Sequence, residues 1–381
     1  MKTCKHFNDC GGCRLQDILY KDQLSDKENR IKELISSYRP GLKLNPINPS
    51  QSHFYRNKME FTFAADGRVI CGLYSKKQKG KVVDLEECLI FSKDAGKLLS
   101  KVKEFVNKLN YSVYNKYSHQ GFLRNLIIRQ TKFTGQTMVA IVTTSKEQLD
   151  KDNLVKELLL LELESPISSI YWVINDSLSD AVVFERKKLL YGEAYLKEEL
   201  GELSFKIDVD SFFQVNPRMS VNFYKKIRDY ANLTKKQNVL DLFCGVGSIG
   251  IFLAASAKFV WGIEAAKAIV DMAWQNAREN KVENISFIVS DVRRFLNTQK
   301  EFYKDADLLV VNPPRSGLSN KIIRAILRFS PKAIIYSSCN PEAFFRDLEG
   351  LKGAYKPDFI EPFDFFPHTP HLECLSLLKP V

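Results

Sequence analysis

The sequence predicts an α/β fold whose second half is a doubly wound, mainly parallel sheet. From about residue 206, short apolar runs alternate with amphipathic segments of helical period, which is typical of a sheet covered by helices on both faces. A glycine-rich turn follows one of the runs, and a polar or titratable residue lies at the end of each. Residues 1–205 lack this alternation. We therefore predict two domains, an α+β domain over 1–205 and an α/β domain over 206–381.

The α/β half can be divided into elements from its apolar pattern. A strand near 205–210 and a helix ending near 231 come first. The expected strands are then 238–243, 259–263, 285–290, 308–312 and 333–338, and the expected helices are 248–257, 265–280, 321–329 and 341–348. Ligands of such sheets bind beyond the carboxyl ends of the strands. The residues expected to carry chemistry are those at or just after these ends, Asp241, Glu264, Asp291, Asn312 and Cys339.

The first half is predicted to mix helices and strands. Ile18 to Ser37 has helical periodicity, with Ile31 and Ile35 on one face and charged residues on the other. In Tyr55 to Phe63 aromatic and basic residues interleave. Such a strand can stack bases and neutralise phosphates, but an edge strand with solvated cations has the same pattern. The sequence leaves both interpretations open.

The charge of the chain favours a polyanionic partner. Its 381 residues carry a net charge of +11, and its isoelectric point is about 9.1. No apolar run approaches the length of a membrane helix, and the first residues have no apolar segment of the secretory type. We therefore expect a cytoplasmic protein with reduced cysteines and no membrane partner.

Three cysteines near the start form the pattern C-x5-C-x2-C. They are Cys4, Cys10 and Cys13, and Cys88 is the candidate for a fourth ligand. Four thiolates can hold Zn²⁺ or an iron–sulfur cluster, and the three-plus-one spacing favours the cluster without settling the choice. Cys71 is a competing fourth ligand, but it lies in an expected strand and is predicted to be a core residue.

The glycine-rich turn is the strongest single motif. Gly245, Gly247 and Gly250 match G-x-G-x-x-G between a strand and a helix, where backbone amides approach a ligand closely. Glu264, at the end of the next strand, is placed to accept both ribose hydroxyls of a bound nucleoside. A dinucleotide or S-adenosylmethionine fits these features, as does a turn with no ligand. Asp241 favours S-adenosylmethionine, because its charge would repel a pyrophosphate and attract a cationic methionine group.

The last two strands end in residues suited to nucleophilic and general-base catalysis. Cys339 lies between a strand and a helix that Asn340 is expected to cap, and a helix N-terminus favours a thiolate. A buried core cysteine is the alternative. Glu373 precedes the final apolar strand, so it is either a partly buried base or a solvent-facing strand start. Asn312 begins an Asn-Pro-Pro loop that either is only a rigid connection or forms a wall between cofactor and substrate.

Five motifs in this order resemble a known family, the RNA uracil-5-methyltransferases. They are F-F-Q-V-N at 212–216, D-L-F-C-G-V-G at 241–247, N-P-P-R at 312–315, S-C-N-P at 338–341 and H-x-E-C at 371–374. The resemblance spans essentially the whole chain. It implies a Rossmann-like domain that uses S-adenosylmethionine as methyl donor.

The resemblance also implies roles for individual residues. Cys339 would attack C6 of uracil, and Glu373 would remove the C5 proton. The residues that would contact the methyl donor, besides the glycine turn at Gly245, are Gln214, Phe243, Glu264 and Asn312. Many members have aspartate where Asn312 stands, so its contact could be with the substrate or with the methyl donor.

The cysteines are similar to those of the family members that methylate 23S rRNA, which hold a [4Fe–4S] cluster. The resemblance thus implies Cys4, Cys10, Cys13 and Cys88 as cluster ligands and 23S rRNA as the partner of a monomeric enzyme. One kind of 23S rRNA enzyme usually carries an extra N-terminal TRAM domain, and a first cysteine at residue 4 leaves no room for it. We therefore expect the kind without that domain.

The chemistry agrees with the residue types. A thiolate that adds to C6 makes C5 nucleophilic, and loss of the C5 proton then expels the thiolate. The target uridine must leave its stack, and Phe212 and the 55–63 strand are candidates for holding it. Two other classes stay open, namely a cytidine or tRNA uridine C5-methyltransferase and a non-catalytic iron–sulfur RNA-binding protein.

Overall fold

The computed structural model describes residues 3–179 and 182–381, and these form two compact units. The first comprises the residues up to Leu19, Gln51–Glu198 and Ile207–Asp210. The second comprises Tyr20–Ser50, Glu199–Lys206 and Ser211–Val381. A short two-stranded ribbon, β8 (Leu196–Leu200) with β9 (Leu203–Ile207), lies where the chain passes from one unit to the other.

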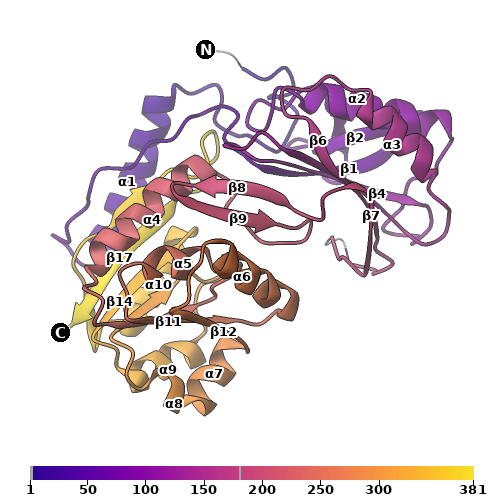
Figure 1. The fold of residues 1–381 in the computed structure, drawn as a ribbon. Helices are drawn as coiled ribbons and strands as arrows, with labels where there is room; N and C mark the ends of the chain where they lie inside the picture. Colours follow the sequence, from indigo (N-terminus) through magenta and orange to yellow (C-terminus); the bar gives the residue numbers. More distant parts are fainter. Residues whose placement is uncertain (1–2, 180–181) are drawn as a thin grey trace. The chain divides into compact units, whose positions relative to one another are not determined.

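The first unit is built on a seven-stranded sheet in the order β3-β2-β1-β4-β5-β6-β7. Its elements are β1 (Lys58–Asp66), β2 (Arg68–Tyr74), β3 (Val82–Asp84), α2 (Ala95–Lys108), β4 (Leu123–Gln130), β5 (Thr137–Thr143), α3 (Lys151–Leu159), β6 (Ile167–Ile174) and β7 (Arg186–Gly192). Only the pair β5–β6, which α3 connects, is parallel. Helices α2 and α3 lie side by side on the sheet (Figure 1). Alternate residues of β5 enter apolar clusters on opposite faces, as the period of a strand requires.

The aromatic residues of the 55–63 segment are core residues. Strand β1 pairs with β2 on one side and β4 on the other, so it is not an edge strand. The side chains of Tyr55, Phe61 and Phe63 are buried against α2 and its neighbours. The prediction that they could stack RNA bases is therefore wrong. It failed because the alternation that suggests a base-stacking strand also places every second side chain in a core.

The second unit has a sheet in the order β12-β11-β10-β13-β14-β17-β15, with β16 also paired to β17. Its elements are α1 (Tyr20–Tyr38), α4 (Pro217–Ala231), β10 (Asn238–Leu242), α5 (Ser248–Ala254), β11 (Phe259–Glu264), α6 (Lys267–Glu279), β12 (Ile285–Val289), α7 (Val292–Thr298), α8 (Lys300–Tyr303), β13 (Leu308–Val311), α9 (Asn320–Phe329), β14 (Ala333–Ser338), α10 (Pro341–Leu351), β15 (Tyr355–Pro357), β16 (Glu361–Phe363) and β17 (Glu373–Pro380). The five strands β10 to β14 are parallel, whereas β17 runs antiparallel between β14 and β15.

Helices cover both faces of this sheet, which confirms the doubly wound prediction. Helices α4, α5 and α6 contact one another or the strands on one face. Helices α7, α9 and α10 enclose a large apolar cluster on the other face (Figure 1). Strand order reverses between β11–β10 and β13, so the carboxyl ends of β10 and β13 form the crevice where ligands of such sheets bind.

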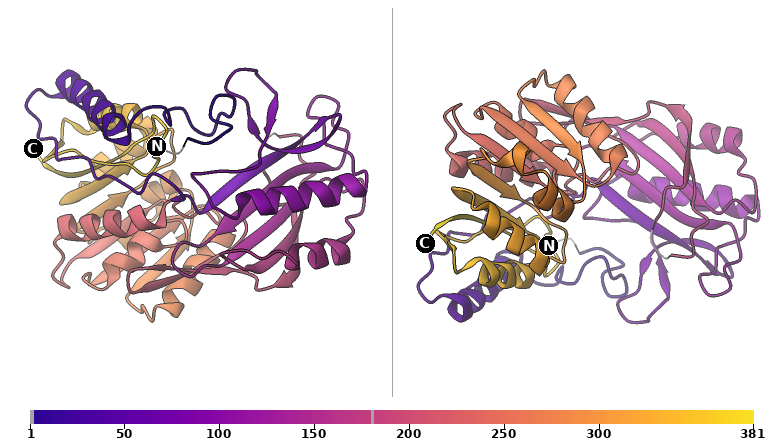
Figure 2. Two further views of the ribbon diagram at one scale, coloured as in Figure 1. Left: turned by 90° about the horizontal axis from the view of Figure 1, so that it is seen from above. Right: turned by 90° about the horizontal axis from the view of Figure 1, so that it is seen from below.

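Helix α1 belongs to the second unit, although it was expected in the domain 1–205. Its apolar face places Ile31 and Ile35 in the same cluster as α7, α9 and α10. It lies beside the C-terminal segment in both views of Figure 2. The compact units thus differ from a single cut at 205/206, because residues Tyr20–Ser50 pack against elements that come after residue 206.

Among residues 3–179 and 182–381, no helix has both the length and the apolar character needed to cross a membrane.

Candidate active site

The glycine turn joins β10 to α5 through backbone conformations that favour glycine. Gly245 and Gly247 have φ of +55° and +82°, and Phe243 adopts a left-handed φ of +61° as well. A Cβ at Gly247 would come within 2.6 Å of the Phe287 ring, so only glycine fits there. The exposed ring of Phe212 lies 4.0 Å from the position of a Cβ at Gly245. The turn thus depends on glycine for its conformation, and the aromatic ring of Phe212 lies beside it.

Asp241 is a buried carboxyl group behind this turn. It is fully buried in β10, and neither of its oxygens has a hydrogen-bond partner within the described part of the chain. The pKa of Asp241 is raised to about 7, mainly by burial and also by the negative charge of Glu264, although the backbone amide of Gly250 acts to lower it. A buried carboxylate without donors is costly, so a ligand that brings a positive charge or a donor would be favoured here.

Glu264 ends β11, the neighbouring strand. Its Oε1 accepts hydrogen bonds from the backbone amides of Ala265 at 2.7 Å and Ala266 at 3.1 Å. These bonds hold the carboxylate at the carboxyl edge of the sheet, on the strand next to Asp241.

Cys339 and Glu373 are brought opposite each other by the pairing of β14 with β17. The antiparallel register ends with Ser338 opposite Cys374, so the next positions along it are Cys339 and Glu373. Side chains directly opposite in such a pair point to the same face, with Cβ atoms about 5 Å apart. The two residues that the sequence predicted as nucleophile and base, 34 positions apart in the chain, thus meet at one end of the sheet.

Burial favours the protonated form of both groups at neutral pH. Glu373 is 2% exposed, and burial raises its pKa to about 8. The pKa of Cys339 is raised to about 11, mainly by burial and also by the Glu373 charge, while the charge of Arg315 acts to lower it. The expected stabilisation of a thiolate by the α10 N-terminus is therefore outweighed by desolvation. Asn340 does not cap α10 with its side chain either, since its Nδ2 donates to the carbonyl of Arg315 at 3.1 Å.

Arg315 connects three of the sequence motifs. Its guanidinium donates to the ring of His371, with 2.9 Å between Nη2 and Nδ1. Its carbonyl accepts the bond from Asn340 described above. Because Arg315 is also the positive charge that lowers the Cys339 pKa, it is the group best placed to favour the thiolate.

Asp347 of α10 fixes the loop that carries Arg315. It is fully buried and accepts hydrogen bonds from the amide of Leu318 and the hydroxyl of Tyr336, both at 2.6 Å. Arg346 pairs with Asp347 at 2.7 Å and donates to the carbonyl of Ser316. The loop after β13 is therefore tied to the helix that follows Cys339.

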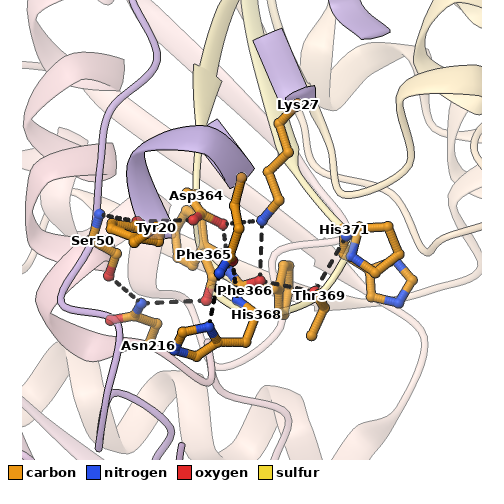
Figure 3. A network of polar contacts seen from close by, with 12 residues as sticks. Tyr20, Lys27, Ser50, Asn216, Asp364, Phe365, Phe366, His368, Thr369 and His371 are labelled. Carbon is orange, nitrogen blue, oxygen red and sulfur yellow. Dashed lines mark hydrogen bonds and ion pairs between the residues drawn. The ribbon is translucent and has the colours of Figure 1, made fainter. Parts of the chain in front are cut away.

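A buried polar network joins α1 to the segment that precedes β17 (Figure 3). Lys27 and Asp364 form an ion pair at 2.7 Å with side chains that are 4% and 0% exposed. Asp364 also accepts from the hydroxyl of Tyr20 at 2.9 Å, and Lys27 donates to the carbonyl of Phe366. The side chain of Gln23 bonds both the backbone amide and the ring of His368.

The comparisons with known proteins show the family of the chain. The family model described as tRNA (Uracil-5-)-methyltransferase matches residues 19–381. The chain belongs to this family. An uncharacterized RNA methyltransferase of Caldanaerobacter subterraneus is 38% identical over 99% of this chain and 84% of its own length. A second, from Clostridium tetani, is 35% identical over 99% of this chain and 83% of its own.

A solved structure gives the same result. The tRNA (uracil-54, C5)-methyltransferase of Pyrococcus abyssi, crystallised with S-adenosyl-L-homocysteine, is 30% identical, with a TM-score of 0.78. The match covers 97% of this chain and 86% of that one. The prediction of a uracil-5-methyltransferase family and of a methyltransferase fold is therefore confirmed.

The remaining predicted residues of this uracil-5-methyltransferase family member lie near the same edge. Asn312 is half-buried directly after β13, next to the central strand β10. Gln214 is half-buried between β9 and α4, two residues after Phe212. Their contacts with a methyl donor stay predictions.

The four predicted cluster cysteines of this methyltransferase lie together in the first unit. Cys4, Cys10, Cys13 and Cys88 all line one cavity, whereas Cys71 is fully buried in β2 outside it. Burial raises the pKa of Cys13, and the charges of the other three raise it further, which reflects their closeness. Within the described ranges, no group of three or more histidine, cysteine, aspartate or glutamate side chains is arranged to hold a metal ion. The shared cavity therefore fits the four cysteines as ligands of one metal group, but their side chains are not arranged around a metal ion.

Sequence reasoning missed the residues that support the site. Arg315 stands in the N-P-P-R motif, but only Asn312 of that motif was given a role. Gln23 and Lys27 were read as part of a solvated face. Gln23 lies eight positions and Lys27 four positions before Ile31, on the same face of α1. Polar residues in line with an apolar stripe were the signal that could have shown a buried network.

Proposed function

We propose that this chain methylates C5 of uracil in RNA, with Cys339 as the nucleophile and Glu373 as the base. The observation that carries the proposal is the β14–β17 register, which sets these residues opposite each other at the edge where the glycine turn lies. A thiol and a buried carboxyl group side by side suit addition to C6 and removal of a proton from the adjacent C5.

The features around the glycine turn fit S-adenosylmethionine. Asp241 offers a buried carboxylate without donors to a cationic ligand, and Glu264 presents a carboxylate already held by two backbone amides. A nucleoside with two ribose hydroxyls suits Glu264, and Gln214, Phe243, Gly245 and Asn312 would complete the contacts. When bound, S-adenosylmethionine supplies the methyl group. Its product form, S-adenosyl-L-homocysteine, is what the Pyrococcus abyssi relative binds.

The residues then act in a fixed order. The Cys339 thiol releases its proton to solvent, and the thiolate forms a bond to C6, which places the electron pair of the C5–C6 double bond on C5 and O4. Arg315 favours this step because its charge lowers the thiol pKa. C5 then bonds the methyl group, whose bond to the sulfur of the donor breaks. Glu373 has a pKa raised to about 8, so it first loses its own proton to solvent. Its carboxylate then takes the proton from C5, the C5–C6 double bond re-forms, and Cys339 leaves as thiolate.

We further propose 23S rRNA as the substrate, as the resemblance of the cysteine pattern implies. The solved relative acts on tRNA, so tRNA is the competing substrate. The net charge of +11 suits either RNA. The cavity lined by Cys4, Cys10, Cys13 and Cys88 would hold the [4Fe–4S] cluster that the same resemblance implies, with each thiolate bound to one iron.

The test separates the two catalytic residues. Wild type, Cys339→Ala and Glu373→Gln are incubated with labelled RNA and S-adenosylmethionine, then examined on denaturing gels and by mass spectrometry. Cys339→Ala should give neither product nor adduct. Glu373→Gln should accumulate a covalent RNA adduct that includes the methyl group, because the C5 proton is removed slowly. An adduct on Cys339→Ala would assign the nucleophile elsewhere.

The same assay identifies the substrate. Cytidine-containing RNA, unmodified 23S rRNA and unmodified tRNA are offered separately to wild-type enzyme, and 5-methyluridine and 5-methylcytidine are quantified. Methylation of tRNA alone would replace 23S rRNA in the proposal, and 5-methylcytidine would replace uracil.

A further inference from the structure

A basic hollow lies between α7 and α9 of the second unit, which are neighbours in Figure 1. Its volume is about 340 Å³. The residues that line it are Arg293, Asn297, Lys321, Arg324 and Arg328. The lining contains four cations and one amide, with neither a carboxylate nor an apolar side chain.

The four cations are not neutralised by the protein. Within residues 3–179 and 182–381, none of them forms an ion pair with a carboxylate. Arg328 donates to Asn297 Oδ1 at 2.6 Å, which ties the two helices together at one end. Arg293, Lys321 and Arg324 are exposed and point their charge at solvent. Four like charges on one surface are unfavourable unless an anionic partner binds there.

The cations of the hollow are spread along the two helices, starting in their first turns. Lys321, Arg324 and Arg328 are spaced i, i+3 and i+7, so they share one face of α9 over roughly 10 Å. Helices in such a sheet begin at the carboxyl ends of the preceding strands. Arg293 and Lys321 stand in the first turns of α7 and α9, near the edge of Asn312 and Glu264, and Arg328 stands at the far end.

We propose that this α7–α9 hollow binds the phosphate backbone of the substrate RNA beyond the target nucleotide. The inference rests on the proposed function, because it takes the ligand to be the RNA whose uracil enters the site. A row of cations about 10 Å long fits successive phosphates better than one small anion. The lack of apolar side chains disfavours a lipid surface or a protein partner, which bury apolar groups. The expected contacts are independent of base sequence.

The test removes three exposed charges from the hollow and compares an equal loss elsewhere on the same unit. The variant of the α7–α9 hollow, called the groove variant below, carries Arg293→Gln, Lys321→Gln and Arg324→Gln. The control removes three exposed lysines from the loops before β10 and β11, at the opposite edge of the sheet. It carries Lys235→Gln, Lys236→Gln and Lys258→Gln. Binding of a labelled oligouridylate to each full-length protein is measured over a range of salt concentrations.

The groove variant should show a slope of log K against log salt that is smaller by about 2, since each single-strand phosphate contact contributes about 0.7. At about 0.1 M salt this corresponds to roughly hundredfold weaker binding. Its KM for the RNA that the wild type methylates should rise while kcat is kept. The control should change the slope much less. Equal changes in both variants, or an unchanged slope in the groove variant, would overturn the inference.

The wild-type arm separates this inference from the proposed function. If wild type methylates uridine and the groove variant binds RNA as wild type does, the hollow is not an RNA site but the proposed function stands. If wild type transfers no methyl group to RNA, the proposed function fails first, whatever the slopes are.

Discussion

Replacing Glu373 by glutamine should stabilise the protein while it damages catalysis. The carboxyl group is 2% exposed, and burial raises its pKa from 4.5 to about 8. Between these values the folded protein holds a proton that the unfolded chain has released. Stability therefore falls as the pH rises from 4.5 towards 8, and the loss is complete only above the folded-state pKa.

The size of the effect follows from the two pKa values. At about 1.4 kcal/mol for each unit, the buried carboxyl group costs about 1 kcal/mol at pH 5 and about 4 kcal/mol at pH 8. Glutamine carries no charge at either pH. Any packing cost of the amide is the same at pH 5 and at pH 8. The unfolding free energy of Glu373→Gln relative to wild type should therefore rise by about 3 kcal/mol from pH 5 to pH 8.

The assay must report on the second unit alone. Trp172 lies in the first unit, and Trp261 and Trp274 lie in the second. In a Trp172→Phe background, tryptophan fluorescence therefore follows urea unfolding of the second unit. The free energy of unfolding of both proteins is measured at about pH 5 and pH 8, without RNA or S-adenosylmethionine. An equal difference between the proteins at the two pH values would refute the reasoning.

Glu361 supplies a matched control of opposite sign. It is also a buried glutamate of the second unit, at 3% exposed. Burial acts to raise its pKa, but hydrogen bonds from Tyr230, Asn48 and Asn45 and the charge of Lys226 hold the pKa below its ordinary value. Its ionised form is therefore stabilising above the unfolded-state pKa and loses this effect as the pH falls. Glu361→Gln should destabilise the unit at pH 8, and less so in acid.

Three further outcomes are expected. Lys27→Met should cost about 3–5 kcal/mol of unfolding free energy, because it leaves Asp364 buried without its cation; adding Asp364→Asn should restore part of it, and a loss below about 1 kcal/mol would contradict the buried pair. Gly247→Ala should cost roughly 2–5 kcal/mol, from its φ of +82° and the contact with Phe287, and an unchanged melting temperature would contradict this. Protein purified without oxygen should contain iron and sulfide at the N-terminal cysteines, whereas stoichiometric zinc without sulfide would exclude the cluster.

The five parallel strands β10 to β14 were predicted to within one residue at each end, whereas β15 and β16 were not predicted. Buried parallel strands have nearly continuous apolar sequences, and glycine turns such as the one at Gly245 mark the residues where the strands end. That information is local. The meeting of Cys339 with Glu373 is not local, because it depends on β17 entering the sheet between β14 and β15, and no pattern within β17 specifies its neighbours.

The failures have the same origin. The segment Tyr55 to Phe63 was ambiguous because its exposure depends on which strands flank β1. Lys27 looked solvated because its partner, Asp364, is hundreds of positions away. For Cys339, the favourable helix terminus could be read from the sequence, whereas the larger cost of burial could be known only from packing.

The contacts of α1 determine the order in which the chain can complete its fold. The helix precedes residues Gln51–Glu198, which form most of the first unit, yet its partners Asp364 and His368 come near the end of the chain. During synthesis, the first unit has all of its own segments long before α1 has any of these partners. Closure of the loop between Lys27 and Asp364 is then among the most distant contacts in the molecule, and such contacts form slowly.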